Sequence, residues 1–205
     1  GQFGDCWVRI APASRGQGYV FEDKIVGGAI PRGFIPAVDK GIQEAAVRGV
    51  LAGFPLVDFK VELFDGSYHT VDSNEQSFKM AGILAFKAVA PKCRPVLLEP
   101  LDEVEVLAPD DYMGDVLGDL SSRRGHILGT EVDEDSLGAM TGYTRIKAIV
   151  PQSELHLYAS TLQSMTQGRA TYVRPFKGYE EMPNEVAQRV ITEHAKEKEE
   201  ELVGV

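Results

Sequence analysis

Short runs of alternating apolar and polar residues fill the first part of the chain, together with two stretches that have a helical period. Residues 57–64, VDFKVELF, alternate strictly, which is typical of a half-buried strand. Apolar residues recur every three or four positions after Pro36 and again from Phe78, which predicts two helices. Asp72 or Ser73 is predicted to cap the second helix. The elements predicted here are strands at 6–10, 19–22 and 57–64, a helix from Pro36 to Gly53, and a helix from Asp72 or Ser73 to Val89, with Glu75 and Gln76 near the capping-box position.

Beyond Pro91 and Pro95 the pattern changes to two similar halves. Each half reads as strand, helix and strand, and Pro109 and Pro151 precede the two helices at matching places. Such a repeat is typical of a split βαβ or ferredoxin-like βαββαβ sandwich. The elements predicted are 96–107, 110–122 and 126–132 in the first half, and 142–150, 152–165 and 169–176 in the second.

A last helix is predicted over residues 184–202. Val186, Val190 and Ile191 form one apolar stripe, whereas the segment after them is rich in glutamate. We therefore expect the first half of this helix to pack and the second half to fray. The fold class is α+β, with predicted domains at 1–92 and 93–178 and the helical segment at 179–205.

Composition narrows the class of protein. The 205 residues carry a formal net charge of −10, with 43% hydrophobic and 25% charged residues. This is an ordinary globular balance, which excludes wholesale disorder, and the excess of acid argues against non-specific binding to a polyanion. No apolar run is long enough to cross a membrane, and residues 1–5 do not resemble a signal peptide. The chain lacks an initial Met and enters a strand almost at once, so we expect it to be part of a longer protein.

The motifs of common catalytic centres are missing from the sequence. No lysine follows a glycine, so there is no P-loop, and no Gly-x-Ser-x-Gly nucleophile motif occurs. Cys6 and Cys93 are too few for a disulfide framework or a zinc site, and we expect two reduced, partly buried thiols. Residues 133–138, DEDSLG, are interpreted as a solvated turn rather than a calcium loop, because the ligand spacing is wrong. No metal site is predicted, and His126, His156 and His194 carry no signal of function.

His69 is the histidine in the most informative position, on a turn between a strand and a helix. A metal triad with Asp72 and Glu75 is conceivable, as is a base–carboxylate pair for acid–base catalysis. However, acid at the start of a helix is explained by the helix dipole, and no nucleophile accompanies the histidine. We therefore favour an exposed contact residue on a protruding loop.

Five runs of residues are more specific than any single position. They are GGAIPRGFIPAVDKGI (27–42), GSYHTVDSNE (66–75), PVLLEP (95–100), GDVLGDLSSRRG (114–125) and QSMTQGR (163–169). In this order and spacing they resemble elongation factor G, the translocation GTPase of bacterial and organellar ribosomes. Cys6-Trp7, residues 76–82 and the glutamate-rich tail depart from the common pattern and suggest a divergent paralogue.

The resemblance implies a fold. Residues 1–92 would be domain IV, an α/β domain related to a small-subunit ribosomal protein, with a left-handed βαβ crossover. Residues 93–178 would be domain V, the ferredoxin-like domain, and the helix in 179–205 would pack back on domain IV. The fragment would have no catalytic site and no cofactor, because GTP and Mg²⁺ would bind in an N-terminal domain of the parent GTPase.

The resemblance also implies contact residues. His69, with Gly66, Ser67 and Tyr68, would form the tip that faces the tRNA–mRNA duplex in the decoding site, and Gln2 would belong to a neighbouring tip loop. A second loop would bring Gly27, Gly28, Ile30 and Pro31 to the same region. Arg123 and Arg124 in domain V would contact ribosomal RNA of the large subunit near the GTPase-associated region; the alternative for these two arginines is a basic helix end that complements the dipole.

The expected function is therefore promotion of tRNA–mRNA translocation by a cytoplasmic, monomeric factor that binds the ribosome and no membrane. Two alternatives stay open at this point. A paralogue could act in ribosome recycling or in ribosome protection of the tetracycline type. In another class, the chain could be a stand-alone RNA-binding or structural module.

Overall fold

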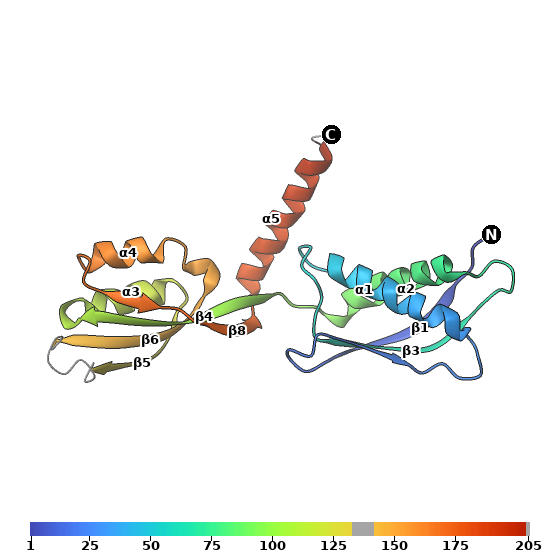
Figure 1. The fold of residues 1–205 in the computed structure, drawn as a ribbon. Coiled ribbons are helices and arrows are strands. Elements are labelled where there is room, and N and C mark those ends of the chain that lie inside the picture. Colours follow the sequence, from blue (N-terminus) through green and yellow to red (C-terminus); the bar gives the residue numbers. More distant parts are fainter. Residues whose placement is uncertain (133–141, 204–205) are drawn as a thin grey trace. The chain divides into compact units, whose positions relative to one another are not determined.

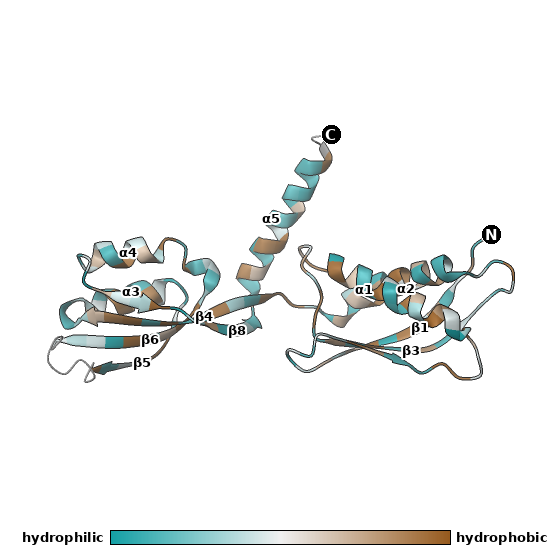
Figure 2. Ribbon diagram, viewed as in Figure 1, coloured by the Kyte–Doolittle hydropathy of each residue, from teal (hydrophilic) through white to brown (hydrophobic). Residues whose placement is uncertain are grey.

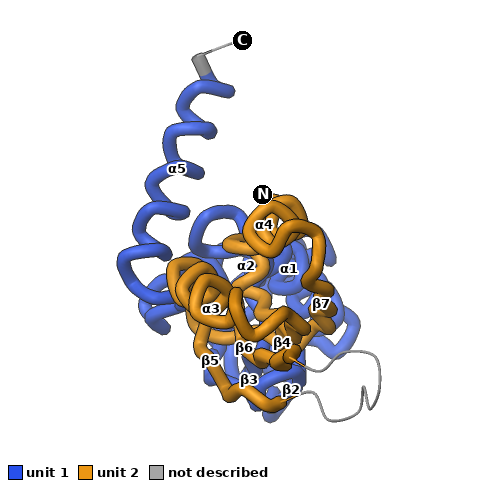
Figure 3. Tube along the Cα trace, turned by 90° about the vertical axis from the view of Figure 1, so that its left-hand side faces the viewer, with its two compact units in different colours: residues 1–97, 183–205 blue, residues 98–182 orange. Residues whose placement is uncertain are grey.

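The computed structural model describes residues 1–132 and 142–203, which form two compact units (Figure 3). The first unit comprises Gly1–Leu97 and Pro183–Val205, and the second comprises Leu98–Met182. The chain therefore leaves the first unit, builds the second and returns. The expected turn at 133–138 lies outside the described residues.

The first unit is a three-stranded sheet with two helices on one face (Figure 1). Strands β1 (Asp5–Pro12) and β2 (Tyr19–Asp23) flank β3 (Phe59–Ser67), β1 running antiparallel and β2 parallel to it. Helix α1 (Ile35–Arg48) connects the parallel pair β2 and β3 as a βαβ unit, and α2 (Glu75–Val89) follows β3. The mixed α/β character predicted for this part is confirmed, while the left hand of the crossover stays a prediction.

The alternation of β3 produces the core of this unit. Phe59, Val61 and Leu63 are buried against α1 and α2, and the residues between them point to the opposite face of the sheet. Cys6 on β1 packs against the same core, and burial together with the charge of Asp5 raises the pKa of its thiol to about 11. This thiol is therefore protonated and unreactive at neutral pH.

Helices α1 and α2 approach closely because each carries a glycine at the contact. A Cβ atom on Gly41 would collide with the carbonyl oxygen of Lys79, and one on Gly82 would collide with the carbonyl oxygen of Val38. The two contacts are reciprocal, since each glycine faces the backbone of the other helix. The interhelical distance is thus set by backbone atoms rather than by side chains.

The ends of both helices differ from the sequence predictions. Helix α1 ends at Arg48, with Gly49 as its cap, instead of continuing to Gly53. Helix α2 is capped by Asn74, whose side-chain oxygen accepts a hydrogen bond from the Ser77 N–H at 2.8 Å, while Ser77 Oγ accepts from the Asn74 N–H at 3.0 Å. Asn74 and Ser77 therefore form the capping box in place of the pairs proposed from the sequence, and Asp72 and Ser73 remain in the preceding loop.

The second unit has the predicted ferredoxin-like arrangement, with strand order β5-β6-β4-β7 and antiparallel neighbours throughout. The two helices α3 and α4 provide the buried residues Val116, Leu120, Tyr158 and Leu162 to its core. Its elements are β4 (Leu98–Pro109), α3 (Met113–Ser122), β5 (His126–Val132), β6 (Tyr143–Pro151), α4 (Tyr158–Met165) and β7 (Thr171–Val173).

The single strand predicted at 169–176 is wrong. Two strands occur instead, because β7 pairs with Glu105–Leu107 of β4, while β8 (Phe176–Glu181) pairs with Leu98–Asp102 at the other end of β4. Pro175, which has no N–H for a strand ladder, lies between them. Strand β8 continues beyond residue 178, so the second unit ends later than the sequence analysis placed it, at Met182.

The helix predicted at 152–165 is also interrupted. A short 3-10 helix at Gln152–Glu154 comes first, and Leu157 then adopts a φ of 56° before α4 begins at Tyr158. A left-handed leucine cannot continue a right-handed helix, so the segment consists of two pieces.

Helix α5 (Asn184–Val203) has two different halves. Val186, Ala187, Val190 and Ile191 are buried or half-buried, whereas residues 195–202 are exposed, and Figure 2 shows hydrophilic colours over most of this second half. His194 is half-buried beside the loop after α1, where a Cβ on Gly53 would lie 3.0 Å from its imidazole. Within residues 1–132 and 142–203, no helix has the length and apolar character to cross a membrane.

The glycine contact between α1 and α2 can be tested by adding one methyl group. Gly41→Ala and Gly82→Ala are each expected to lower the free energy of unfolding of the first unit by about 1–3 kcal/mol, because the backbones must move apart. Urea denaturation followed by the fluorescence of Trp7, the single tryptophan of the chain, reports on this unit.

Gly118→Ala is the matched control, since Gly118 lies within α3 and has no atom within 4 Å of its Cβ position. It is expected to stabilise the second unit by about 0.5–1 kcal/mol, because alanine is the better helix former. Wild-type unfolding of both the Gly41 and the Gly82 variants would show that the helices can separate without cost.

Candidate functional site

The loop between β3 and α2 presents His69 to solvent. Strand β3 ends at Ser67, and α2 begins at Glu75, so a short loop carries the histidine. The His69 side chain is 57% exposed, and Tyr68 beside it is 46% exposed. Two exposed aromatic side chains on a loop whose ends are held by a strand and a helix are typical of a contact site rather than of a packed core.

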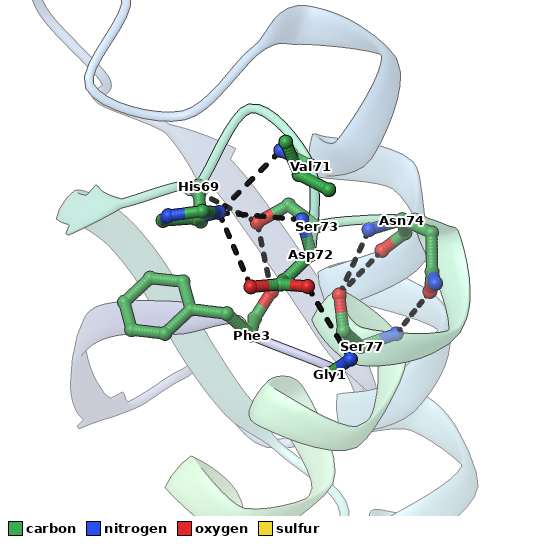
Figure 4. Close-up of polar contacts among 8 residues, drawn as sticks. All are labelled: Gly1, Phe3, His69, Val71, Asp72, Ser73, Asn74 and Ser77. Atoms are coloured by element: carbon green, nitrogen blue, oxygen red, sulfur yellow. Dashed lines mark hydrogen bonds and ion pairs between the residues drawn. The ribbon is translucent and has the colours of Figure 1, made fainter.

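One ring nitrogen of His69 is occupied inside the loop, and the other faces outward. Nδ1 accepts hydrogen bonds from the backbone N–H groups of Val71 and Asp72, both at 3.4 Å, and lies 3.3 Å from Oδ2 of Asp72 (Figure 4). Among the described residues, none makes a hydrogen bond with Nε2. The ring orientation is therefore set by the loop, and Nε2 is the group available to a partner.

The loop is tied to the start of the chain through Ser73. The His69 N–H donates to Ser73 Oγ at 2.9 Å, and Ser73 Oγ donates to the carbonyl oxygen of Phe3 at 2.8 Å. The Phe3 N–H in turn donates to the carbonyl oxygen of Asp72 at 2.9 Å, and the Phe3 ring meets the His69 ring edge-on at 6.4 Å. We call residues 68–73 the tip loop. It is held by hydrogen bonds at His69, Asp72 and Ser73.

Ser73 and Phe3 hold the tip loop, and the sequence analysis does not identify either residue in this role. The sequence predicts Ser73 only as a helix cap, because its short polar side chain next to a helix start has that role as a first expectation. Phe3 is far away in the sequence, and no local pattern connects it with the loop. Gln2 is exposed and lies between Gly1 and Phe3, which both contact Asp72 of the tip loop.

Two further predicted tip residues, Ser67 and Gly66, lie at the end of β3 and contact Asp5 or Ile30. Ser67 Oγ donates to the carboxylate of Asp5 at 2.8 Å, which fastens the end of β3 to β1. Gly66 has no space for a side chain, because a Cβ there would strike the carbonyl oxygen of Asp5 and the side chain of Ile30. Gly66 therefore acts in packing.

The second predicted loop divides in the same way. Gly27 and Gly28 are exposed and adopt φ values of 67° and 71°, which a side chain would disfavour. Ile30 is 1% exposed and belongs to the core, so the prediction of Ile30 as a contact residue is wrong. Its side chain packs beneath Gly66, and Pro31 is half-buried next to it. Of the four residues predicted for this loop, Gly27 and Gly28 are the exposed ones.

The arrangement around His69 does not favour a metal or a catalytic centre. Within residues 1–132 and 142–203, no three His, Cys, Asp or Glu side chains come together in a way that could hold a metal ion. Glu75 lies in the first turn of α2, where its charge complements the helix dipole. His69 and Asp72 do form a close pair, but the pair is open to solvent and Nδ1 is used for holding the ring.

Arg123 and Arg124 are engaged inside the second unit. Arg124 donates to both carboxylate oxygens of Glu99 at 2.8 Å and to Glu154 at 3.0 Å. Arg123 donates to Asp119 at 2.9 Å and to the carbonyl oxygen of Glu154 at 2.6 Å. The bonds to Glu99 raise the pKa of Arg124 further above its ordinary value.

These contacts favour a structural role for both arginines. The Glu99 side chain is only 7% exposed, so its charge depends on the bidentate contact with Arg124. Contact of Arg123 or Arg124 with an RNA phosphate stays a prediction for the guanidinium N–H groups that these bonds do not use.

Comparison with known proteins gives two consecutive family matches. The model for elongation factor G, domain IV, matches residues 1–94, and the model for the elongation factor G C-terminus matches residues 96–190. A crystal structure of a protein from Thermus thermophilus is similar, with 44% sequence identity and a TM-score of 0.79. The match covers 95% of this chain but 28% of that chain, so the sequence spans little more than a quarter of its relative's length.

The hold of Ser73 on the tip loop can be measured by hydrogen exchange. Ser73→Ala removes the acceptor of the His69 N–H and the donor to Phe3, and each bond contributes about 1 kcal/mol. The His69 amide is therefore expected to exchange roughly fivefold faster or more, as followed by NMR. Thr70→Ala in the same exposed loop is the control and is expected to leave this rate unchanged. Equal rates in all three proteins would contradict the proposed brace.

The contact between Arg124 and Glu99 predicts a large loss of stability on substitution. Arg124→Ala leaves a buried carboxylate without its partner and is expected to destabilise the second unit by about 3 kcal/mol in urea denaturation. Adding Glu99→Gln to this variant removes the charge and is expected to recover part of the loss. Arg189→Ala, an exposed arginine on α5, is the control and is expected to change stability by less than about 0.5 kcal/mol. A small effect of Arg124→Ala would contradict the structural role and would favour a contact of this arginine with RNA.

Proposed function

Because the chain belongs to the elongation factor G family, we propose that it is the ribosome-facing part of a GTPase that promotes tRNA–mRNA translocation in the cytoplasm. The observation that carries the proposal is the succession of the domain IV and C-terminal matches across residues 1–190. Domains of this family imply interaction with the ribosome in general. The movement of tRNA and mRNA, and the residues involved, are the proposal.

His69 is assigned the central contact in this proposal. The first unit would enter the decoding site of the small subunit, with the tip loop directed at the tRNA–mRNA duplex. The outward Nε2 of His69 would form a hydrogen bond with the duplex, while Nδ1 remains hydrogen-bonded within the loop. Because the hydrogen bonds of Ser73 already order the loop, little conformational entropy would be lost on binding.

The proposed mechanism is steric and involves no bond cleavage in this chain. A folded unit that occupies the vacated site would prevent the duplex from slipping back, and polar groups of the tip loop would replace the contacts that the ribosome had made. The exposed Gly27-Gly28 turn would border the same region, and its backbone would be accessible because glycine has no side chain. GTP and Mg²⁺ would bind in another part of the protein, since this chain contains no P-loop motif.

The strongly acidic composition is compatible with this role. A formal net charge of −10 disfavours indiscriminate attachment to RNA. Affinity would then depend on a few local donors, such as the imidazole of His69, and on the shape of the contact surface. Such a protein can leave the ribosome after each cycle.

The test uses the full-length factor that contains this chain, with His69→Ala. Single-round translocation on ribosomes is expected to slow about tenfold or more, while multiple-turnover GTP hydrolysis continues, because the histidine is remote from nucleotide chemistry. Thr70→Ala is the matched control in the same loop and is expected to translocate like the wild type.

The remaining outcomes separate the alternatives. Normal translocation by the His69→Ala factor would remove His69 from the contact while leaving the family role intact. A wild-type factor that hydrolyses GTP on ribosomes without translocation would overturn the translocase proposal in favour of a recycling paralogue, and subunit splitting would be the next assay.

A further inference from the structure

One face of the first unit's sheet is open. Helices α1 and α2 both cover the face formed by residues such as Val61 and Leu63 (Figure 1). The register places Arg9 opposite Glu62, so the residues that alternate with the core residues lie on the other face. Trp7, Arg9 and Phe64 lie on this open face.

Trp7, Arg9 and Phe64 form a continuous surface, here called the aromatic platform. The guanidinium carbon of Arg9 lies 4.0 Å from the centroid of the Phe64 ring. The Trp7 and Phe64 rings meet edge to face, with centroids 6.4 Å apart. Trp7 is 56% exposed although it is the largest apolar side chain available. Exposure of this much indole costs free energy in water, which favours a partner that covers it.

The charge on the platform is uncommitted. Among the described residues, none forms a hydrogen bond or ion pair with Arg9, whose recorded contact is the Phe64 ring. By contrast, the charge of nearby Lys60 is paired, because its Nζ lies 3.0 Å from a carboxylate oxygen of Glu22 and 3.2 Å from one of Glu62. Arg9 therefore offers its guanidinium donors to an external acceptor, in a chain that is otherwise strongly acidic.

We propose that the aromatic platform binds an unpaired RNA nucleotide, with the base stacked on Trp7 and a phosphate bound by Arg9. Aromatic side chains on an open sheet, next to an arginine, provide the two interactions that single-stranded nucleic acid needs. A stable protein interface buries roughly 800 Å² per partner, far more than two rings and a guanidinium present, whereas one nucleotide fits this size. The inference rests on the proposed function only for the source of the RNA, the ribosome.

Trp7 makes the proposal directly measurable, because it is the only tryptophan of the chain. Titration of the 205-residue chain with an eight-residue oligouridylate or oligoadenylate at low salt is expected to quench its fluorescence as bases stack on the indole. Inorganic polyphosphate of matched charge has no bases and is expected to leave the fluorescence unchanged. Quenching by both polymers would show a charge effect and would overturn the stacking.

Substitutions locate the site by the anisotropy of a fluorescein-labelled oligonucleotide. Trp7→Leu and Arg9→Ala are each expected to weaken binding about tenfold or more. Arg9→Lys keeps the charge but loses the flat contact with Phe64, so we expect an intermediate loss. Leu84→Ala on α2 and Arg189→Ala on α5 are the exposed controls and are expected to bind like the wild type. Circular dichroism verifies that each variant is folded.

Equal affinities for the Trp7, Arg9 and control variants, or absence of any quenching at millimolar oligonucleotide, would overturn the platform. This outcome is independent of the His69 test. A factor that fails in translocation can still bind RNA through the platform, and a translocating factor can lack this binding. The two proposals therefore fail separately.

Discussion

The close approach of α1 and α2 is the constraint on which the first unit depends. Gly41 and Gly82 allow each helix to touch the backbone of the other, which fixes the position of α2 above the sheet. Since α2 begins directly after the tip loop, its position also determines where His69 is presented. The hydrogen bonds of Ser73 then orient a loop whose two ends are already fixed. The candidate contact site is thus a consequence of the packing beneath it.

Polar residues in the two units have different uses. In the second unit, Arg123 and Arg124 satisfy internal carboxylates and a carbonyl oxygen, so their charge contributes to the fold. In the first unit, His69 and Arg9 keep hydrogen-bonding groups that the described residues leave free. In the two proposals, these uncommitted groups of an acidic chain are the ones that would distinguish a particular RNA from other polyanions.

Much of the fold could be predicted from local patterns, and the failures have physical causes. The alternation in β3 and the repeated strand–helix–strand halves depend on neighbouring residues, so the sequence predicted them well. The left-handed Leu157 and the break at Pro175 depend on tertiary packing, which the hydrophobic periodicity of the sequence does not reveal. His69 could be found from its motif, whereas Phe3, its partner through Ser73, could not. Ile30 shared a motif with the exposed Gly27-Gly28 turn, and only the structure separates a surface glycine from the core residue near it.

The return of the chain to the first unit affects the order of events during synthesis. Residues 1–97 leave the ribosome long before residues 183–205, so the sheet and its two helices can assemble while α5 is still unmade. The contact of His194 with the loop at Gly53 then closes a very long loop and must form late. Every residue of the second unit is translated before that contact can form. Docking of α5 on the nascent chain therefore occurs only after the second unit has been synthesised.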